Sequence, residues 1–119
     1  MKFSILKENI VEELQLLQGI VEKRNTMPIL ANILMEVDAD IELTGTDLEV
    51  GLKARIEASV EKPGSITIPG KKVFEIVKSL RDGETVTFET GKEQTLRILS
   101  GASEFKVHCL PREDYPQVP

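Results

Sequence analysis

The chain has 119 residues, of which 40% are apolar, 29% are charged and 4% are aromatic, and its net charge is −5. This length and composition fit one globular domain with a core of valine, isoleucine and leucine. The negative net charge argues against a strong free-standing nucleic-acid binder. The single cysteine, Cys109, excludes an intrachain disulfide and a cysteine-based zinc site, and suits a reducing, cytoplasmic location. No apolar run approaches the length needed to span a membrane.

The first half of the chain begins with a short strand at residues 2–6. A helix is predicted next and ends near Glu22, because four apolar residues recur at helical spacing: Ile10, Leu14, Leu17 and Val21. Residues 29–37 predict a buried strand, residues 38–40 a tight turn and residues 41–44 a further strand. Apolar residues then occupy every second position from 48 to 60, which predicts one long strand with one face on the core.

The second half repeats this order. Residues 61–65 predict a turn and residues 66–68 a short strand. Pro69 opens a second helix with the core stripe Val73, Val77 and Leu80, and Asp82-Gly83 closes it. Three strands follow at 85–90, 95–100 and 104–109, and the proline-rich tail 110–119 predicts the start of an extended interdomain linker. Since strand, helix and three strands occur twice, in residues 1–60 and 64–109, we predict an α+β fold with two helices on antiparallel sheet.

The sequence offers no combination of residues that predicts an active site. Alternation places His108 on the outer side of the last strand, and no serine or cysteine beside it forms a nucleophile–base pair. Cys109 shares a face with apolar residues and is interpreted as a small core residue. The aspartates that could be considered as metal ligands are Asp38, Asp40 and Asp47. Asp38 and Asp40 lie in a predicted hairpin turn, where aspartate is ordinary turn chemistry. We therefore predict no catalytic residue, no metal and no cofactor.

The second helix carries the most informative surface, within a region, residues 62–81, that holds five basic residues and one acid. Lys71 and Lys78 lie opposite the core stripe, with Glu75 between them. A solvated face and non-specific phosphate contact both explain this pattern. Arg24, in the loop after the first helix, is a further candidate for phosphate contact.

A second feature of the same helix is an apolar arc that extends past its core stripe. Lys72 and Ile76 border the stripe next to Leu80. Such an arc indicates either a packing partner or a wide core, and spacing alone leaves both open.

Several segments together resemble a known family. They are Met1-Lys2-Phe3, residues 27–34, residues 43–49, residues 68–72, and Leu110-Pro111 with Asp114-Tyr115-Pro116. Over essentially its whole length the chain resembles the first domain of bacterial DNA polymerase III beta subunits, the sliding clamps. The resemblance implies a non-catalytic processivity factor, a head-to-tail homodimeric ring of three domains per protomer around duplex DNA, which it holds without sequence preference.

The resemblance also implies roles for particular residues. Arg24, Lys71 and Lys78 match DNA-facing positions. The positions that match the protomer interface are Lys72, Ile76, Leu80, Phe105 and Val107. The polymerase and the clamp loader would bind through later domains that this sequence does not contain.

Two departures from the family pattern leave an alternative open. The first helix carries no basic residue on the face opposite its core, which holds Glu8, Glu12, Gln15, Gly19 and Glu22. The chain also corresponds to one domain of three, and one domain cannot encircle DNA. The alternative is a stand-alone small DNA- or protein-binding module, with which the proline-rich tail and the uneven charge are compatible.

Overall fold

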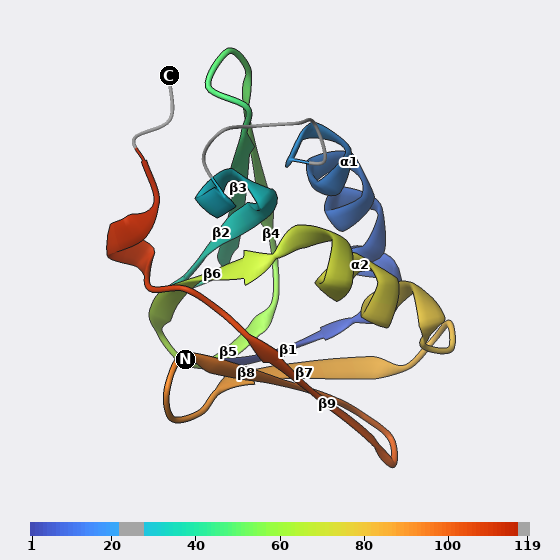
Figure 1. Ribbon diagram of the computed structural model, residues 1–119. Coiled ribbons are helices and arrows are strands. Elements are labelled where there is room, and N and C mark those ends of the chain that lie inside the picture. The colour runs from blue at the N-terminus through green and yellow to red at the C-terminus, as the bar shows by residue number, and fades with distance from the viewer. Residues whose placement is uncertain (22–27, 117–119) are drawn as a thin grey trace.

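The computed structural model describes residues 1–21 and 28–116. The first half holds β1 (Lys2–Leu6), the 3-10 turn η1 (Lys7–Asn9), α1 (Val11–Val21), η2 (Pro28–Ala31), β2 (Asn32–Val37), β3 (Ile41–Thr46), β4 (Gly51–Ile56) and β5 (Ser59–Lys62). The second half holds β6 (Gly64–Pro69), α2 (Gly70–Ser79), β7 (Thr85–Thr90), β8 (Thr95–Ser100), β9 (Ser103–His108) and η3 (Arg112–Asp114). The predicted doubling of a strand–helix–strands unit is confirmed (Figure 1).

The two halves exchange their first strands. One sheet has the order β5-β1-β7-β8-β9 and the other the order β4-β3-β2-β6, so β1 joins the strands of the second half and β6 joins those of the first. Both exchanges are antiparallel, with Phe3 opposite Phe88 and Ile33 opposite Ile68. Because each sheet contains strands from both halves, neither half can complete its sheet alone.

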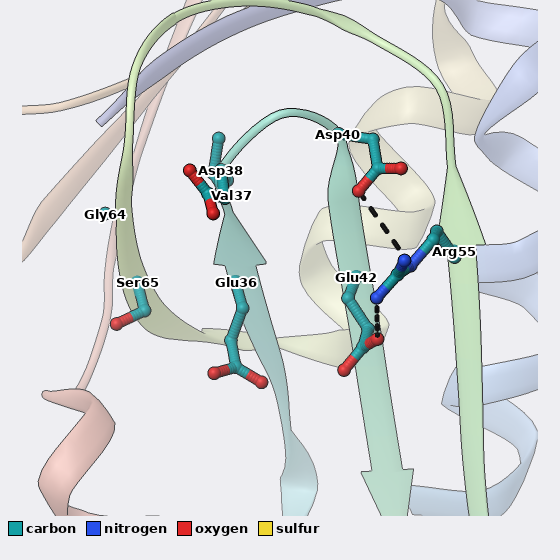
Figure 2. Close-up of a pocket in the computed structure, with 8 residues that line it drawn as sticks. All are labelled: Glu36, Val37, Asp38, Asp40, Glu42, Arg55, Gly64 and Ser65. Atoms are coloured by element: carbon teal, nitrogen blue, oxygen red, sulfur yellow. Dashed lines mark hydrogen bonds and ion pairs between the residues drawn. The ribbon is translucent and has the colours of Figure 1, made fainter.

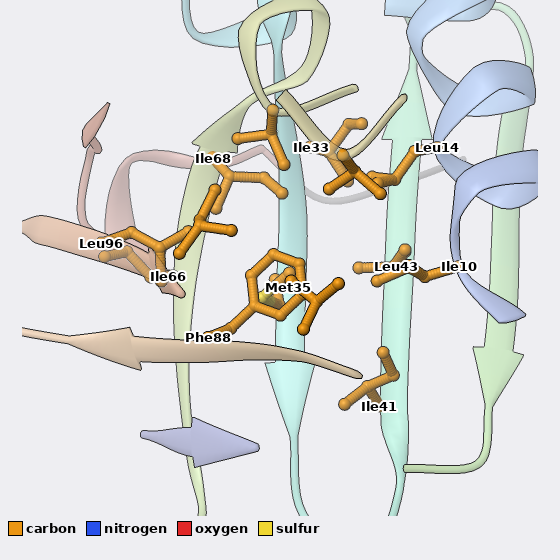
Figure 3. Packing of buried hydrophobic residues seen from close by; sticks show 14 of the residues in the cluster. Ile10, Leu14, Ile33, Met35, Ile41, Leu43, Ile66, Ile68, Phe88 and Leu96 are labelled. Carbon is orange, nitrogen blue, oxygen red and sulfur yellow. The ribbon is translucent and has the colours of Figure 1, made fainter. Parts of the chain in front are cut away.

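The core lies between the helices and the two sheets. The predicted stripes are confirmed: Leu14 and Leu17 of α1 and Val73 and Val77 of α2 are fully buried. Figure 3 shows side chains from both sheets and from α1 meeting in one interior. The helices pack beside each other, and a Cβ on Gly70 would come within 3.0 Å of a Val21 methyl group, so a side chain there would push α2 away.

The prediction of one long strand at 48–60 was wrong. β4 pairs with β3 in one sheet, whereas β5 pairs with β1 in the other, so the chain changes sheet between them. Leu48 and Val50 precede β4 in an exposed turn, and Leu48 takes the left-handed backbone conformation with φ of 77°. The alternation runs through 48–60 because β4 and β5 are successive strands with the same side-chain period of two residues. This period does not indicate which strand each of them pairs with.

Smaller differences concern where elements begin and end. The sequence predicts a strand from residue 29, but residues 28–31 form the 3-10 turn η2 and β2 begins at Asn32. Pro28 has no backbone N–H to donate to a neighbouring strand. The predicted turn at 61–65 is shorter: β5 runs to Lys62 and β6 begins at Gly64. α2 ends at Ser79, because Leu80 adopts an extended backbone before the turn at Gly83.

The tail packs onto the domain through Pro116, although the sequence predicts the start of an extended linker there. Leu110 pairs with Thr67 of β6, and the Arg112 guanidinium lies 3.7 Å from the carboxylate of Glu36 on β2. Tyr115 is 5% exposed, and its hydroxyl lies 3.4 Å from a main-chain oxygen of β3. These contacts lead the tail across the outer side of the β4-β3-β2-β6 sheet.

Burial of Tyr115 predicts an unusual titration. Burial raises the pKa of Tyr115 to about 12, whereas the pKa of an unfolded tyrosine is about 10. The folded state therefore holds the proton more tightly, so this contribution to stability is complete below about pH 10 and is lost as the pH rises towards 12. Because Tyr115 is the one tyrosine in the chain, tyrosinate absorbance against pH reports it directly. A midpoint near that of free tyrosine would contradict the packed tail.

Candidate nucleic-acid and partner interface

Helix α2 presents its lysines away from the core, as predicted. Val73 and Val77 are fully buried, whereas Lys71, Glu75 and Lys78 are exposed. Lys71 lies in the first turn, where the partial positive charge of the helix N-terminus adds to its own. This face can contact an anionic backbone, although Glu75 between the two lysines reduces the local positive potential.

Lys78 contacts an aromatic ring of the same helix. Its Nζ lies 5.7 Å from the centroid of the Phe74 ring, a cation–π distance. Lys78 also lies in the last turn of the helix, where the partial negative charge of the C-terminus favours a cation. Arg24, the third predicted phosphate contact, lies outside the described residues.

The exposed face of α1 differs in charge. Glu12, Gln15 and Gly19 are exposed there, together with Leu16, which is 59% exposed. Nothing lies within 4 Å of a Cβ placed on Gly19. No lysine or arginine lies on α1, which is described in full from Val11 to Val21. This helix therefore offers no basic side chain to phosphate, and of α1 and α2 only α2 carries lysines.

The residues predicted for a protomer interface belong to α2, to its C-cap and to the edge strand β9. Lys72 is exposed, and Ile76 and Phe105 are partly buried against the core. Leu80 and Val107 are 8% and 4% exposed, so their side chains are largely covered by this chain itself. A partner at this edge would therefore meet mainly Lys72, Ile76 and Phe105.

The polar residues considered for chemistry have structural surroundings. His108 is exposed, and burial raises the pKa of the Cys109 thiol to about 12, which keeps it protonated at neutral pH. Within the turn 38–40, the backbone N–H of Asp38 donates to the carbonyl of Asp40. The Asp47 carboxylate accepts the backbone N–H groups of residues 49 and 50, and so shapes the β3–β4 turn.

A shallow acidic pocket lies at one end of the β4-β3-β2-β6 sheet. It is lined by Glu36, Val37, Asp38, Asp40, Glu42, Arg55, Gly64 and Ser65 (Figure 2). Arg55 lies at its β4 side, with its Nε 3.9 Å from Asp40 and its Nη2 3.2 Å from Glu42. Residues 1–21 and 28–116 contain no group of three or more histidine, cysteine, aspartate or glutamate side chains arranged to hold a metal ion.

Within these same ranges no helix is both long and apolar enough to cross a membrane.

Comparison with known proteins identifies the family. Residues 1–119 match the family described as DNA polymerase III beta subunit, N-terminal domain. The beta sliding clamps of Pseudomonas aeruginosa and Escherichia coli are 40% and 37% identical over 120 residues, covering 99% of this chain and 32% of each relative. A crystal structure of the P. aeruginosa DNA polymerase sliding clamp matches all of this chain with a TM-score of 0.93 at 37% identity. The chain spans about a third of the length of these relatives. The chain therefore belongs to the DNA polymerase III beta subunit family and corresponds to the N-terminal domain of its members.

Proposed function

We propose that this chain is one segment of a ring-shaped clamp that encircles duplex DNA and tethers the replicative DNA polymerase. The observation that carries the proposal is the position of the lysines on α2, on the side of the helix away from the core. The match to sliding clamps over the whole chain supports it. Its contacts with DNA are non-specific, because lysine ammonium groups recognise phosphate and carry no base preference.

The mechanism of such a clamp is topological. A closed ring cannot leave DNA sideways, so weak contacts suffice while the tethered polymerase stays at high local concentration. The acidic face of α1 is compatible with this mechanism, since a ring that slides needs no tight grip. The domain is then a non-catalytic accessory part of the polymerase assembly in the cytoplasm, without a cofactor.

The partners follow from the same proposal. The ring is a head-to-tail homodimer in which α2 and β9 of this domain meet the second protomer. The interface residues are Lys72, Ile76 and Phe105, with Leu80 and Val107 beneath them. The polymerase and the clamp loader bind to domains that follow this one in the longer relatives.

The test is binding of the chain to a short fluorescent primer–template duplex, titrated from low to physiological salt. We expect weak binding that disappears by physiological salt, and weaker binding still for Lys71→Ala/Lys78→Ala. The slope of log affinity against log salt should fall by about 1 for each lysine removed. Lys62→Ala/Lys92→Ala removes two exposed lysines outside α2 and should leave the slope unchanged. Tight, salt-resistant binding would instead favour a stand-alone DNA-binding module.

A further inference from the structure

A pocket lies between the C-terminal tail and the outer side of the β4-β3-β2-β6 sheet, and is called the tail pocket below. Its volume is about 410 Å³, within the range of about 300–1,000 Å³ that is common for ligand pockets. The strands β2, β3 and β4 and the tail all contribute side chains to its lining. The residues on which the argument depends are Leu34, Glu36, Thr44, Lys53, Arg112 and Tyr115.

The floor of the tail pocket is a row of side chains across three strands. Leu43 of β3 belongs to the hydrophobic core, and a Cβ on Gly45 would meet α1, so Thr44 between them faces the outer side of the sheet. In the strand register Thr44 is opposite Leu34 of β2 and opposite Lys53 of β4. The row therefore places a hydroxyl between an apolar side chain and an ammonium group.

The hydroxyl of Thr44 is the most unusual group in this row. Thr44 is 1% exposed, and its Oγ1 has no hydrogen-bond partner within residues 1–21 and 28–116. By contrast, the hydroxyls of the buried Thr46 and Thr67 donate to the carbonyls of Val50 and Leu110. A buried hydroxyl normally has a partner, because burial removes the water that it would otherwise bind. A ligand in the tail pocket can supply that partner.

Two cations beside the hydroxyl determine the charge of such a ligand. The Lys53 ammonium lies 4.0 Å from Glu42 and the Arg112 guanidinium 3.7 Å from Glu36, both longer than a hydrogen bond of about 2.7–3.2 Å. Both cations therefore have donors to offer. Lys53 and Arg112 give the lining two positive charges and Glu36 gives it one negative charge, which leaves a net charge of +1.

This charge and the shape of the donors favour a carboxylate. A carboxylate carries one negative charge, and its two oxygens match the planar fork of the Arg112 guanidinium. A phosphate monoester, with a charge of about −1.5 to −2, is less well matched beside Glu36. Leu34 and the ring of Tyr115 add apolar lining for a hydrocarbon stem. The ligand is then a carboxylate on a short stem, which a peptide provides at an acidic side chain or at its C-terminus.

We propose that the tail pocket binds the carboxylate of a peptide. The Thr44 hydroxyl donates a hydrogen bond to the carboxylate, and Arg112 and Lys53 balance its charge. Because Arg112 belongs to the tail and Thr44 to β3, a bound peptide also fastens the tail to the sheet. The inference does not rest on the proposed contact with DNA, which involves the lysines of α2.

Three short peptides, each acetylated at the N-terminus, serve as probes. The first has a glutamate side chain and an amidated C-terminus, the second has glutamine and a free C-terminal carboxylate, and the third has glutamine and an amide. The chain has no tryptophan and one tyrosine, so the fluorescence of Tyr115 reports binding at the pocket. At low salt we expect a carboxylate peptide to bind with a Kd about tenfold lower than the neutral one.

The arms of this titration separate the sources of the carboxylate. The first two peptides distinguish a side-chain carboxylate from a C-terminal one. Sodium acetate provides the carboxylate without a peptide and should bind far more weakly than either. Equal binding of the acidic and neutral peptides would overturn the proposal, and binding of acetate as tight as that of the peptides would overturn its assignment to a peptide.

Thr44→Val tests the hydroxyl while keeping the shape of the side chain. We expect it to raise the Kd about fivefold or more, and to leave the midpoint of urea denaturation unchanged or higher, since the lost hydroxyl has no partner in the described part of the chain. A Thr44→Val chain that binds as the unchanged chain does would overturn the proposal. A clear loss of stability would overturn it too, because the hydroxyl would then serve the fold.

Arg112→Gln tests the guanidinium and should also raise the Kd. Its matched control is Arg55→Gln, the same change on β4, where Arg55 pairs with Asp40 and Glu42 and does not line the tail pocket. An equal effect of both changes would show that only the general charge of the surface attracts the peptide, and would overturn the proposed site. Failure of these tests leaves the DNA titration unaffected, so the two proposals fail separately.

Discussion

Phe88→Ala is expected to lower the free energy of unfolding by about 3–5 kcal/mol, a large part of the roughly 5–15 kcal/mol that holds a domain folded. Phe88 is fully buried on β7 and stacks on Phe3 of β1, with ring centroids 4.8 Å apart and planes 13° from parallel. The change removes this contact and leaves a cavity where the exchanged strand β1 joins the second half. Urea denaturation followed by far-UV circular dichroism measures the loss.

Leu6→Ala provides the matched control. Leu6 lies on β1, the strand of Phe3, but its side chain is 42% exposed. Truncating Leu6 should therefore lower the free energy of unfolding far less than truncating Phe88. Phe3→Ala/Phe88→Ala then closes a double-mutant cycle, in which the stacked pair should show a coupling of about 0.5–1.5 kcal/mol. A loss below about 1 kcal/mol for Phe88→Ala would show that the two halves are not joined through this contact.

The local elements of the fold could be predicted from the sequence, whereas the pairing of distant strands could not. The strands at 2–6, 85–90 and 95–100 and the apolar stripes of both helices were predicted correctly, since each depends on neighbouring residues. The exchange of β1 and β6 pairs residues far apart in the chain, and side-chain period carries no information about partners. The mistaken strand at 48–60 has the same cause.

In the candidate site, too, only what depends on local spacing could be predicted from the residues themselves. Helical spacing placed Lys71 and Lys78 away from the core, and the structure agrees. The assignment of Lys72, Ile76 and Phe105 to a protomer contact came from the family resemblance and stays a prediction.

Lys7 was not singled out from the sequence, although it joins the first half of the chain to the end of α2. It is 8% exposed, and its Nζ donates to the carbonyl of Leu80 at 2.7 Å and to the Asp82 carboxylate at 2.8 Å. Beside it, the Glu8 carboxylate accepts the backbone N–H of Gly83. The ammonium of Lys7 therefore lies at the C-terminal end of α2, where a helix favours positive charge.

Lys7→Met is expected to lower the free energy of unfolding by about 1–3 kcal/mol, because it leaves the buried Leu80 carbonyl without its donor. Methionine retains most of the hydrocarbon chain, so lost packing contributes little. Asp82→Asn should cost less, because the Asp82 side chain is 84% exposed and water already screens its ion pair. Urea denaturation of both variants separates the buried hydrogen bond from the surface charge.

Lys62→Met supplies the control for removing a lysine as such, since Lys62 is exposed and should change stability by no more than about 0.5 kcal/mol. If Lys7→Met matched Lys62→Met, the Leu80 carbonyl would have another donor in solution, and Lys7 would not hold the end of α2. If Lys7→Met were clearly less stable than Lys62→Met, the contact between Lys7 and the Leu80 carbonyl would fix the last turn of α2, which carries Ile76 and Lys78. A residue of the first half would then determine where the second half presents its lysine and its partner-facing side chain.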